Sequence, residues 1–390
     1  MAESDTVLNS KIGFLDTRLA LIHVPLEAYS HFVLPISQLL FHNPLVDEDG
    51  KTIEASRPWT YWHPFVNVSV TTNECSIVCP RRQADELFAP IIPGLSESLQ
   101  QRVSISQEDF AAIVITGSGL EAGQRVLDLT SPLALAGIPI FFITSYHCDF
   151  ILVALNTRST VIRALEERGF VFEVDDTPGE AGHMINPASP VMNPRHRTSS
   201  ASSFDFPRLP GTPPPSTVPE LQERTFRLLK KHNISPVIDD STELVTCAGI
   251  KDYTHGNYIA KFTGGKMTLG LMHCLSQPSP PRFFSLTLTT RDSASLTIER
   301  SLLDLFPDRG DDVLLGTDGP GQIPITLDLR GLPLESTGIV CGLSSRLIDG
   351  MKGHMVDEVF NMSYLSTARA GHVIVYENEL ADAIKALNSL

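Results

Sequence analysis

The hydrophobic positions of one stretch follow the periods of strands and helices closely enough to predict five elements. These are a strand at residues 113–115, a helix at 126–136, strands at 138–143 and 150–155, and a helix at 157–168. Apolar residues recur every three or four positions in the helical runs and are continuous in the strands. Gly137 follows the first helical run, where a helix end favours a residue with positive φ. The order strand–helix–strand–strand–helix, βαββα, is that of a small ferredoxin-like module.

The same order recurs at the C-terminal end. The predicted elements there are a strand at residues 325–329, a helix from Ile339, strands at 360–365 and 372–376, and a helix marked by Leu380, Ile384 and Leu387. Residues 144–153 also align without gaps against residues 366–375. An internal repeat defines an architecture more firmly than an isolated motif does.

Two less regular stretches carry the same pattern. The first has strands at residues 18–24, 65–70 and 76–79 and helices at 26–41 and 81–88. The second has strands at residues 243–250, 283–289 and 294–298, a helix at 258–272 that we expect to break at Gly264 and Gly265, and a helix at 299–306. The chain is therefore predicted to be α+β, with four tandem ferredoxin-like βαββα modules. Their predicted bounds are residues 14–92, 110–176, 235–306 and 323–390.

A change in composition separates the second module from the third. Ten of the 28 prolines lie between Pro178 and Pro219, in a stretch rich in Ser and Gly and poor in aliphatic residues. Such a stretch buries too little apolar surface to order itself, so residues 177–220 are predicted to be a disordered linker. Hydroxyl residues follow basic ones in the segment Arg195–Ser200. The linker is therefore either passive or a substrate for a basophilic kinase.

Charge and cysteine usage exclude several classes of protein. The formal net charge of −15 argues against a nucleic-acid partner, because phosphates require a basic face. No secretory signal opens the sequence, and the longest apolar stretch, Phe32–Phe41, is about half a membrane span. A cytoplasmic protein with six free cysteines is the expectation. Cys75 and Cys79 flank a strand and have no second ligand pair at close spacing, so no metal site is expected.

No motif reaches the requirements of catalysis. The segment Thr116–Leu120 lies at a strand-to-helix turn but lacks the spacing of a hydrolase nucleophile elbow. The glycines of Gly117–Gly123 are one residue out of step with a dinucleotide fingerprint. Gly316–Gly321 has no Lys and no following helix, so it is interpreted as a turn. We therefore expect a protein that is not an enzyme and uses no cofactor.

The turns that open the first helix of modules two and four suit a binding site. A helix N-terminus offers unpaired N–H groups and the positive end of the dipole, which can hold a carboxylate. Gly119 and Gly338 would let the backbone approach a ligand closely. The turns predict binding of a small anionic group, such as the carboxylate of an amino acid.

Three stretches resemble the ACT-domain family, and within it the CASTOR-type cytosolic arginine sensors. They are residues 144–153 (TSYHCDFILV), residues 334–340 (LESTGIV), and Ser366-Thr367 together with residues 372–375 (HVIV). The resemblance covers most of the chain apart from residues 43–62 and the linker. It implies four ACT modules in two tandem halves. It further implies a non-enzymatic sensor that binds a free amino acid between modules two and four and signals to a protein partner in the TOR nutrient pathway.

The resemblance also implies a set of ligand-binding residues. Module two would supply Pro139 and Ile140, and module four would supply Pro333, Glu335, Ser336, Thr337, Gly338, Ile339, Thr367, Ala368 and Gly371. The sensors carry an aspartate at the position of Gly371 and a glutamate at that of Ser336. Loss of a buried counter-charge is costly when the ligand keeps its charge, so arginine is not the expected ligand. Glu335 and Asp149 are the candidates to supply the missing charge.

Two alternatives to the sensor remain open at this stage. The chain is either such a sensor, a regulatory subunit of an amino-acid biosynthetic enzyme, or an ACT scaffold without a ligand. A closed apolar interface between modules two and four would favour the scaffold. Homodimerisation through sheet edges or helices is also expected, and neither a nucleic acid nor a membrane is an expected partner.

Overall fold

The computed structural model describes residues 11–41, 62–116, 122–172, 215–250, 259–310, 312–334, 336–351 and 360–388. Several features named above lie outside the described residues. They are Gly117–Leu120, the kinase motif Arg195–Ser200, most of the predicted linker, and Glu335. Among the helices in the described ranges, none is both long and apolar enough to cross a membrane.

The elements up to residue 166 form two successive groups. The first group is β1 (Lys11–Phe14), β2 (Leu19–Val24), α1 (Tyr29–Phe41), β3 (Phe65–Thr71), β4 (Cys75–Pro80), α2 (Arg81–Gln83), α3 (Glu97–Gln100) and β5 (Ser104–Ile105). The second group is β6 (Phe110–Thr116), α4 (Ala122–Leu135), β7 (Ile140–Thr144), β8 (Asp149–Ala154) and α5 (Arg158–Glu166). The strands predicted here and the helices that match α1, α4 and α5 are confirmed, and Gly137 has a φ of 71° after α4. The helix predicted at residues 81–88 is α-helical only at α2 and continues as a π-helix at Ala84–Phe88.

The remaining elements form two further groups. The third is α6 (Val218–Lys231), β9 (Val237–Ile238), β10 (Leu244–Gly249), α7 (Ile259–Leu275), β11 (Phe283–Thr289), β12 (Ser295–Glu299) and β13 (Leu314–Leu315). The fourth is β14 (Gln322–Asp328), α8 (Ile339–Met351), β15 (Met362–Ser366), β16 (Ala370–Tyr376) and α9 (Leu380–Asn388). The mixed α+β class is confirmed. Residues 300–305, predicted as a helix, form a 3-10 helix.

Two predictions about helix bounds are wrong. The linker was expected to extend to residue 220, but α6 begins at Val218, because Thr217 caps it by accepting a hydrogen bond from the Glu220 N–H. The helix of the third group was expected to break at Gly264 and Gly265, but α7 continues through both. Its other glycine, Gly270, is where the helix packs most closely, since a Cβ there would lie 2.1 Å from the Phe306 ring.

Twelve strands close into a ring, which the sequence did not predict. Their order is β6–β8–β7–β15–β16–β14–β10–β12–β11–β3–β4–β2, and β2 then pairs with β6 through Leu19 and Phe110. The longest strand pairing between distant parts of the chain is the antiparallel pair β3–β11. Phe65 lies opposite Thr289 at one end of this pairing, and Thr71 lies opposite Phe283 at the other. One continuous sheet marks no module boundaries, so the bounds given above stay predictions.

Four short strands lie beside the ring. β5 pairs with β2 and β13 with β10, whereas β1 and β9 reach across to β6 and β14. The first strand of each half, β1 or β9, thus pairs with the second group of that half. The pairing ties the two groups of each half together.

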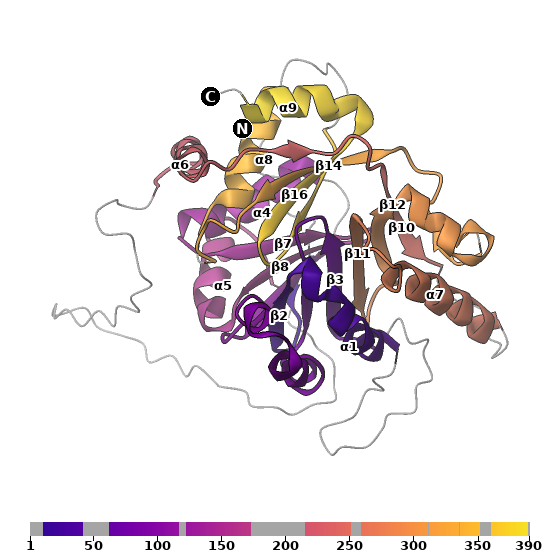
Figure 1. Cartoon of the computed structure of the whole chain (residues 1–390). Coiled ribbons are helices and arrows are strands. Elements are labelled where there is room, and N and C mark those ends of the chain that lie inside the picture. The colour runs from indigo at the N-terminus through magenta and orange to yellow at the C-terminus, as the bar shows by residue number, and fades with distance from the viewer. Residues whose placement is uncertain are drawn as a thin grey trace.

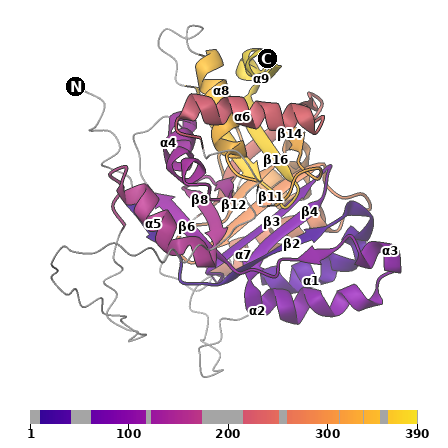
Figure 2. The ribbon, with the colours of Figure 1, turned by 90° about the vertical axis from the view of Figure 1, so that its left-hand side faces the viewer.

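Helices cover the outside of the ring in two sets, visible in Figures 1 and 2. α1 and α7 pack over the strands of the first and third groups, while α4, α5, α6, α8 and α9 pack over those of the second and fourth. Each set of helices covers one apolar cluster on the outside of the ring, and a smaller apolar cluster fills the inside. Its members alternate with outward residues along each strand, as Ala112 and Val114 do with Ile113.

Candidate functional site

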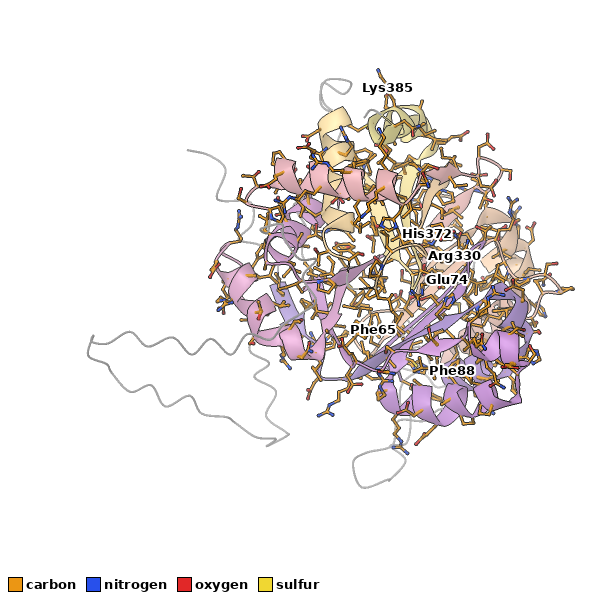
Figure 3. The ribbon with its side chains drawn as sticks, turned by 60° about the vertical axis from the view of Figure 1, so that its left-hand side comes forward. Phe65, Glu74, Phe88, Arg330, His372 and Lys385 are labelled. Atoms are coloured by element: carbon orange, nitrogen blue, oxygen red, sulfur yellow. The ribbon has the colours of Figure 1, made fainter. Side chains whose placement is uncertain are left out.

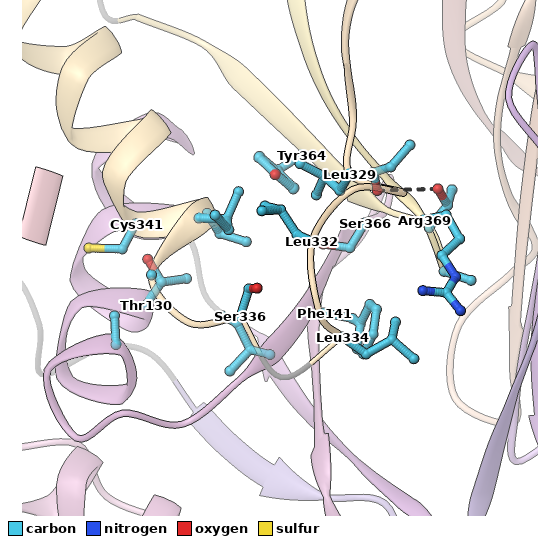
Figure 4. Close-up of a pocket in the computed structure, with 18 of the residues that line it drawn as sticks. Thr130, Phe141, Leu329, Leu332, Leu334, Ser336, Cys341, Tyr364, Ser366 and Arg369 are labelled. Carbon is cyan, nitrogen blue, oxygen red and sulfur yellow. Dashed lines mark hydrogen bonds between the residues drawn. The ribbon is translucent and has the colours of Figure 1, made fainter. Parts of the chain in front are cut away.

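A pocket lies where the second and fourth groups meet (Figure 4). It contains about 660 Å³ of empty space, including the part open to solvent. The second group supplies Thr130, Ala134, Ile138, Ile140 and Phe141. The fourth supplies Leu329, Leu332, Pro333, Leu334, Ser336, Gly338, Ile339, Val340, Cys341, Tyr364, Ser366, Thr367, Ala368, Arg369 and Ala370. The interface between these groups therefore contains a pocket that opens to solvent and has mostly apolar walls.

One wall is the N-terminus of α8. Gly338 leads into the helix with a φ of 80°, a conformation that other residues adopt at a cost. A Cβ on Gly338 would also lie 2.9 Å from Leu221 of α6, so the close packing of α6 requires glycine as well. The first N–H groups of a helix have no partner within it and carry the positive end of its dipole. They suit a carboxylate.

The opposite wall is the turn between β15 and β16. The Thr367 N–H donates to the Ala370 carbonyl (2.9 Å), and the Leu329 N–H donates to the Arg369 carbonyl (2.8 Å). The first bond closes the turn, and the second attaches it to the residue that follows β14. The turn thereby presents a fixed edge to the pocket.

Two hydrogen bonds fasten β7 to β15 behind the pocket. The Phe142 N–H donates to Ser366 Oγ (2.9 Å), and the Tyr364 N–H donates to Thr144 Oγ1 (3.0 Å). The strands otherwise pair directly at Ile143 and Leu365. Side-chain hydroxyls thus extend a short backbone pairing, and they hold the two groups together beside the cavity.

The residues predicted to bind a ligand divide into three sets. Those that line the pocket are Ile140, Pro333, Ser336, Gly338, Ile339, Thr367 and Ala368. Pro139, Thr337 and Gly371 are described but do not line it, and Glu335 lies outside the described residues. A role in ligand binding stays a prediction for all of them.

The sequence reasoning missed Tyr364, whose ring fills the space beside Gly371. Tyr364 pairs with Val373 across β15 and β16, so Gly371 is its diagonal neighbour on the same face. A Cβ on Gly371 would lie 2.4 Å from Tyr364 Oη. The tyrosine is buried, and burial raises the pKa of its hydroxyl. A neutral phenol therefore occupies the space beside Gly371. An aromatic residue diagonal to a strand glycine was the available signal.

The proposed source of a compensating charge, Asp149, is engaged elsewhere. Its Oδ2 lies 2.5 Å from Arg125 Nε, and the carboxylate is buried. Burial raises the pKa of Asp149, and the Arg125 charge opposes that rise. Asp149 is not among the described residues that line the pocket. Arg369 is the one charged residue among them. Asp149 therefore has Arg125 as its partner, and the pocket lining gives no support to the hypothesis that it supplies a charge to the ligand.

We expect Gly371→Ala to lower the free energy of unfolding by about 1–3 kcal/mol, because the added methyl group would overlap the Tyr364 hydroxyl. Tyr364 is too buried to move aside freely. Urea denaturation of Gly371→Ala and of Gly371→Ala combined with Tyr364→Phe measures the effect. The double variant should recover part of the loss, since Cζ remains 3.3 Å from the new methyl. An equal loss in both would show that the hydroxyl is not the cause.

Comparison with known proteins supports part of the sequence interpretation. Residues 105–167 match the family model described as ACT domain. This range covers the second group, from the end of β5 to α5. The chain therefore contains an ACT domain, a regulatory, amino-acid-binding module with a ferredoxin-like fold. No curated protein matches the chain significantly.

The solved structures that match parts of the chain include two connected with aspartate kinase. The aspartate kinase from Synechocystis is 13% identical with a TM-score of 0.29, and the match covers 98% of this chain and 55% of that one. The ligand-free regulatory subunit of aspartate kinase from Thermus thermophilus is 14% identical with a TM-score of 0.26, covering 40% and 96%. A protein from Agobacterium tumefaciens is 18% identical with a TM-score of 0.28, covering 44% and 98%.

Proposed function

We propose that the chain is a non-enzymatic regulatory protein that binds one free amino acid in the pocket between the second and fourth groups. The observation that carries the proposal is the position of the pocket. It lies against the N-terminus of α8 on one side and against residues between Thr130 and Phe141, within the matched ACT domain, on the other. The helix N-terminus would hold the ligand carboxylate, as backbone N–H groups do at such sites.

The lining favours an amino acid with an uncharged side chain. Most of the pocket wall is aliphatic or aromatic, as at Ile140, Phe141 and Leu332. Within the described part of the lining no carboxylate faces the cavity, and Arg369 adds a positive charge. A guanidinium group buried there would lack a counter-charge and would face a like charge. Leucine, isoleucine, methionine and phenylalanine fit these walls better than arginine does.

The wider proposal extends the resemblance to the whole chain. Its four groups would be four ACT modules in two halves, acting in the cytoplasm. The liganded state would change the binding of a protein partner, with the TOR nutrient pathway as the setting that the resemblance suggests. The open pocket supports this function over that of a scaffold without a ligand. A regulatory subunit of a biosynthetic enzyme would use the same site, and homodimerisation fits either function.

A thermal-shift screen against the twenty free amino acids at millimolar concentration tests the proposal. A ligand present at 100 times its Kd should stabilise the folded chain by about 2.7 kcal/mol, since it binds only the folded state. We expect a selective shift from an amino acid with an uncharged side chain. Ser336→Ala should reduce the shift, because Ser336 lines the pocket.

Ser98→Ala is the matched control for this variant. It removes the same hydroxyl from exposed α3, outside the pocket, and should leave the shift unchanged. No shift with any amino acid, on a cooperatively folded sample, would contradict the proposed function. A shift with arginine that Glu335→Ala abolishes would contradict the uncharged ligand class alone.

A further inference from the structure

The turn of residues 367–369 has a second face, which contacts the first group of the chain. Thr367, Ala368 and Arg369 all line the pocket. On its other side the turn meets Glu74, which precedes β4, and Ser76 within β4. Glu74 and Thr367 are separated by 293 positions in the chain. One short segment therefore belongs both to the pocket and to a contact between the two halves.

Glu74 makes two hydrogen bonds to the turn and a third to His23 of its own half. Its Oε1 accepts from Thr367 Oγ1 and from the Arg369 N–H, each at 2.6 Å, and its Oε2 lies 2.5 Å from His23 Nδ1. The Ala368 N–H donates to Ser76 Oγ at 3.0 Å. The Glu74 side chain is fully buried. Figure 3 labels Glu74, together with Arg330 and His372. A buried carboxylate that accepts several hydrogen bonds is a fixed point in the structure.

Neither Glu74 nor Ser76 lines the pocket. Glu74 acts on the pocket wall through the Arg369 N–H and the Thr367 hydroxyl, and Ser76 acts through the Ala368 N–H. Their removal would leave the Arg369 or Ala368 N–H without its acceptor in a buried place, which disfavours the present conformation of the turn.

We propose that Glu74 and Ser76 are positioning residues for the pocket: they hold the turn of residues 367–369 in its binding conformation from the other half of the chain. This inference rests on the proposed function, because it concerns the regulation of the same site. Binding in the pocket and packing of the two halves are then linked, and the linkage acts in both directions. A partner that separates the halves would weaken the binding of the amino acid.

Calorimetric titration and amide hydrogen exchange on the full chain test the inference. The probes are the twenty free amino acids, and the one that binds is titrated against each variant. Glu74→Ala should raise its Kd about tenfold, and Ser76→Ala should raise it less. In both variants the amides of Ala368 and Arg369 should exchange faster. Ser76→Ala keeps the test available if Glu74→Ala does not fold.

Ser69→Ala is the control, because Ser69 pairs directly with Ser76 across β3 and β4. Its buried hydroxyl contacts Asn67 and Ser285 and does not touch the turn, so the Kd and the exchange should both stay unchanged. If no amino acid binds the unaltered chain, the proposed function fails, and faster exchange would still support the positioning role. Unchanged exchange at Ala368 and Arg369, or an unchanged Kd for a bound amino acid, would overturn it.

Discussion

Phe65→Ala is expected to lower the free energy of unfolding by about 3–5 kcal/mol, the cost of emptying a buried phenylalanine site. Phe65 begins β3 and is fully buried inside the ring. Its ring meets that of Phe150 on β8 edge to face, with 4.9 Å between the centroids. The first and second groups thus contact each other across the interior. The cost depends on the closure of the ring, because an open sheet would leave Phe65 on a face without helices.

Phe88→Ala separates this effect from the general cost of losing a phenylalanine. Phe88 is equally buried but packs against Phe32 of α1, beneath the helices (Figure 3 labels both Phe65 and Phe88). Urea denaturation of the two variants should give losses of similar size. A large loss for Phe88→Ala with a small loss for Phe65→Ala would show that the ring is open in solution.

The longer elements could be predicted because each carries its own periodicity. The apolar residues of α4 recur at helical spacing, and those of β8 form one continuous buried run, so a local pattern suffices. β5, β9 and β13 are two residues long and leave no such pattern. Their positions depend on the strands that they join, which local periodicity does not encode.

Ring closure left a signal that is visible only by comparison of two distant strands. Polar residues at every second position are typical of a strand with one solvated face, as at Asn67 and Ser69. Both are buried here, because β11 offers Ser285 and Thr287 at the facing positions. Asn67 donates to the Ser285 and Thr287 hydroxyls. The polar faces of β3 and β11 are complementary, so they bury each other.

Part of the candidate site could be predicted from local sequence and resemblance together. The turn at Gly338 precedes a helix, and its spacing indicates an N-terminal site without any tertiary information. Tyr364 and Arg369 could not be recognised in this way. They reach the pocket through the β15–β16 hairpin, where the diagonal neighbour Gly371 leaves room for the tyrosine ring. Their contribution depends on strand register.

His372 is expected to make the folded chain less stable in acid. It lies fully buried on β16, with Nδ1 3.0 Å from Thr326 Oγ1 and its ring edge-on to Phe283. Burial lowers the pKa of the imidazole from 6.5 to about 4, and the charge of nearby Glu74 opposes the shift. The unfolded chain therefore binds a proton at a higher pH than the folded chain does. The stability that neutral His372 contributes is complete above pH 6.5 and is lost as the pH falls toward 4.

His372→Gln tests this dependence, because glutamine retains a hydrogen-bonding group for Thr326 and cannot take up the proton. Free energies of unfolding are measured for both proteins between pH 7 and pH 4. The wild type should lose about 3 kcal/mol more than the variant over this range, the equivalent of the pKa difference. Parallel curves would contradict the assignment. The NMR signal of the His372 imidazole is identified by its absence from the spectrum of His372→Gln. We expect this imidazole to stay neutral in the folded wild type until about pH 4. Titration near the ordinary pKa of histidine would contradict the assignment.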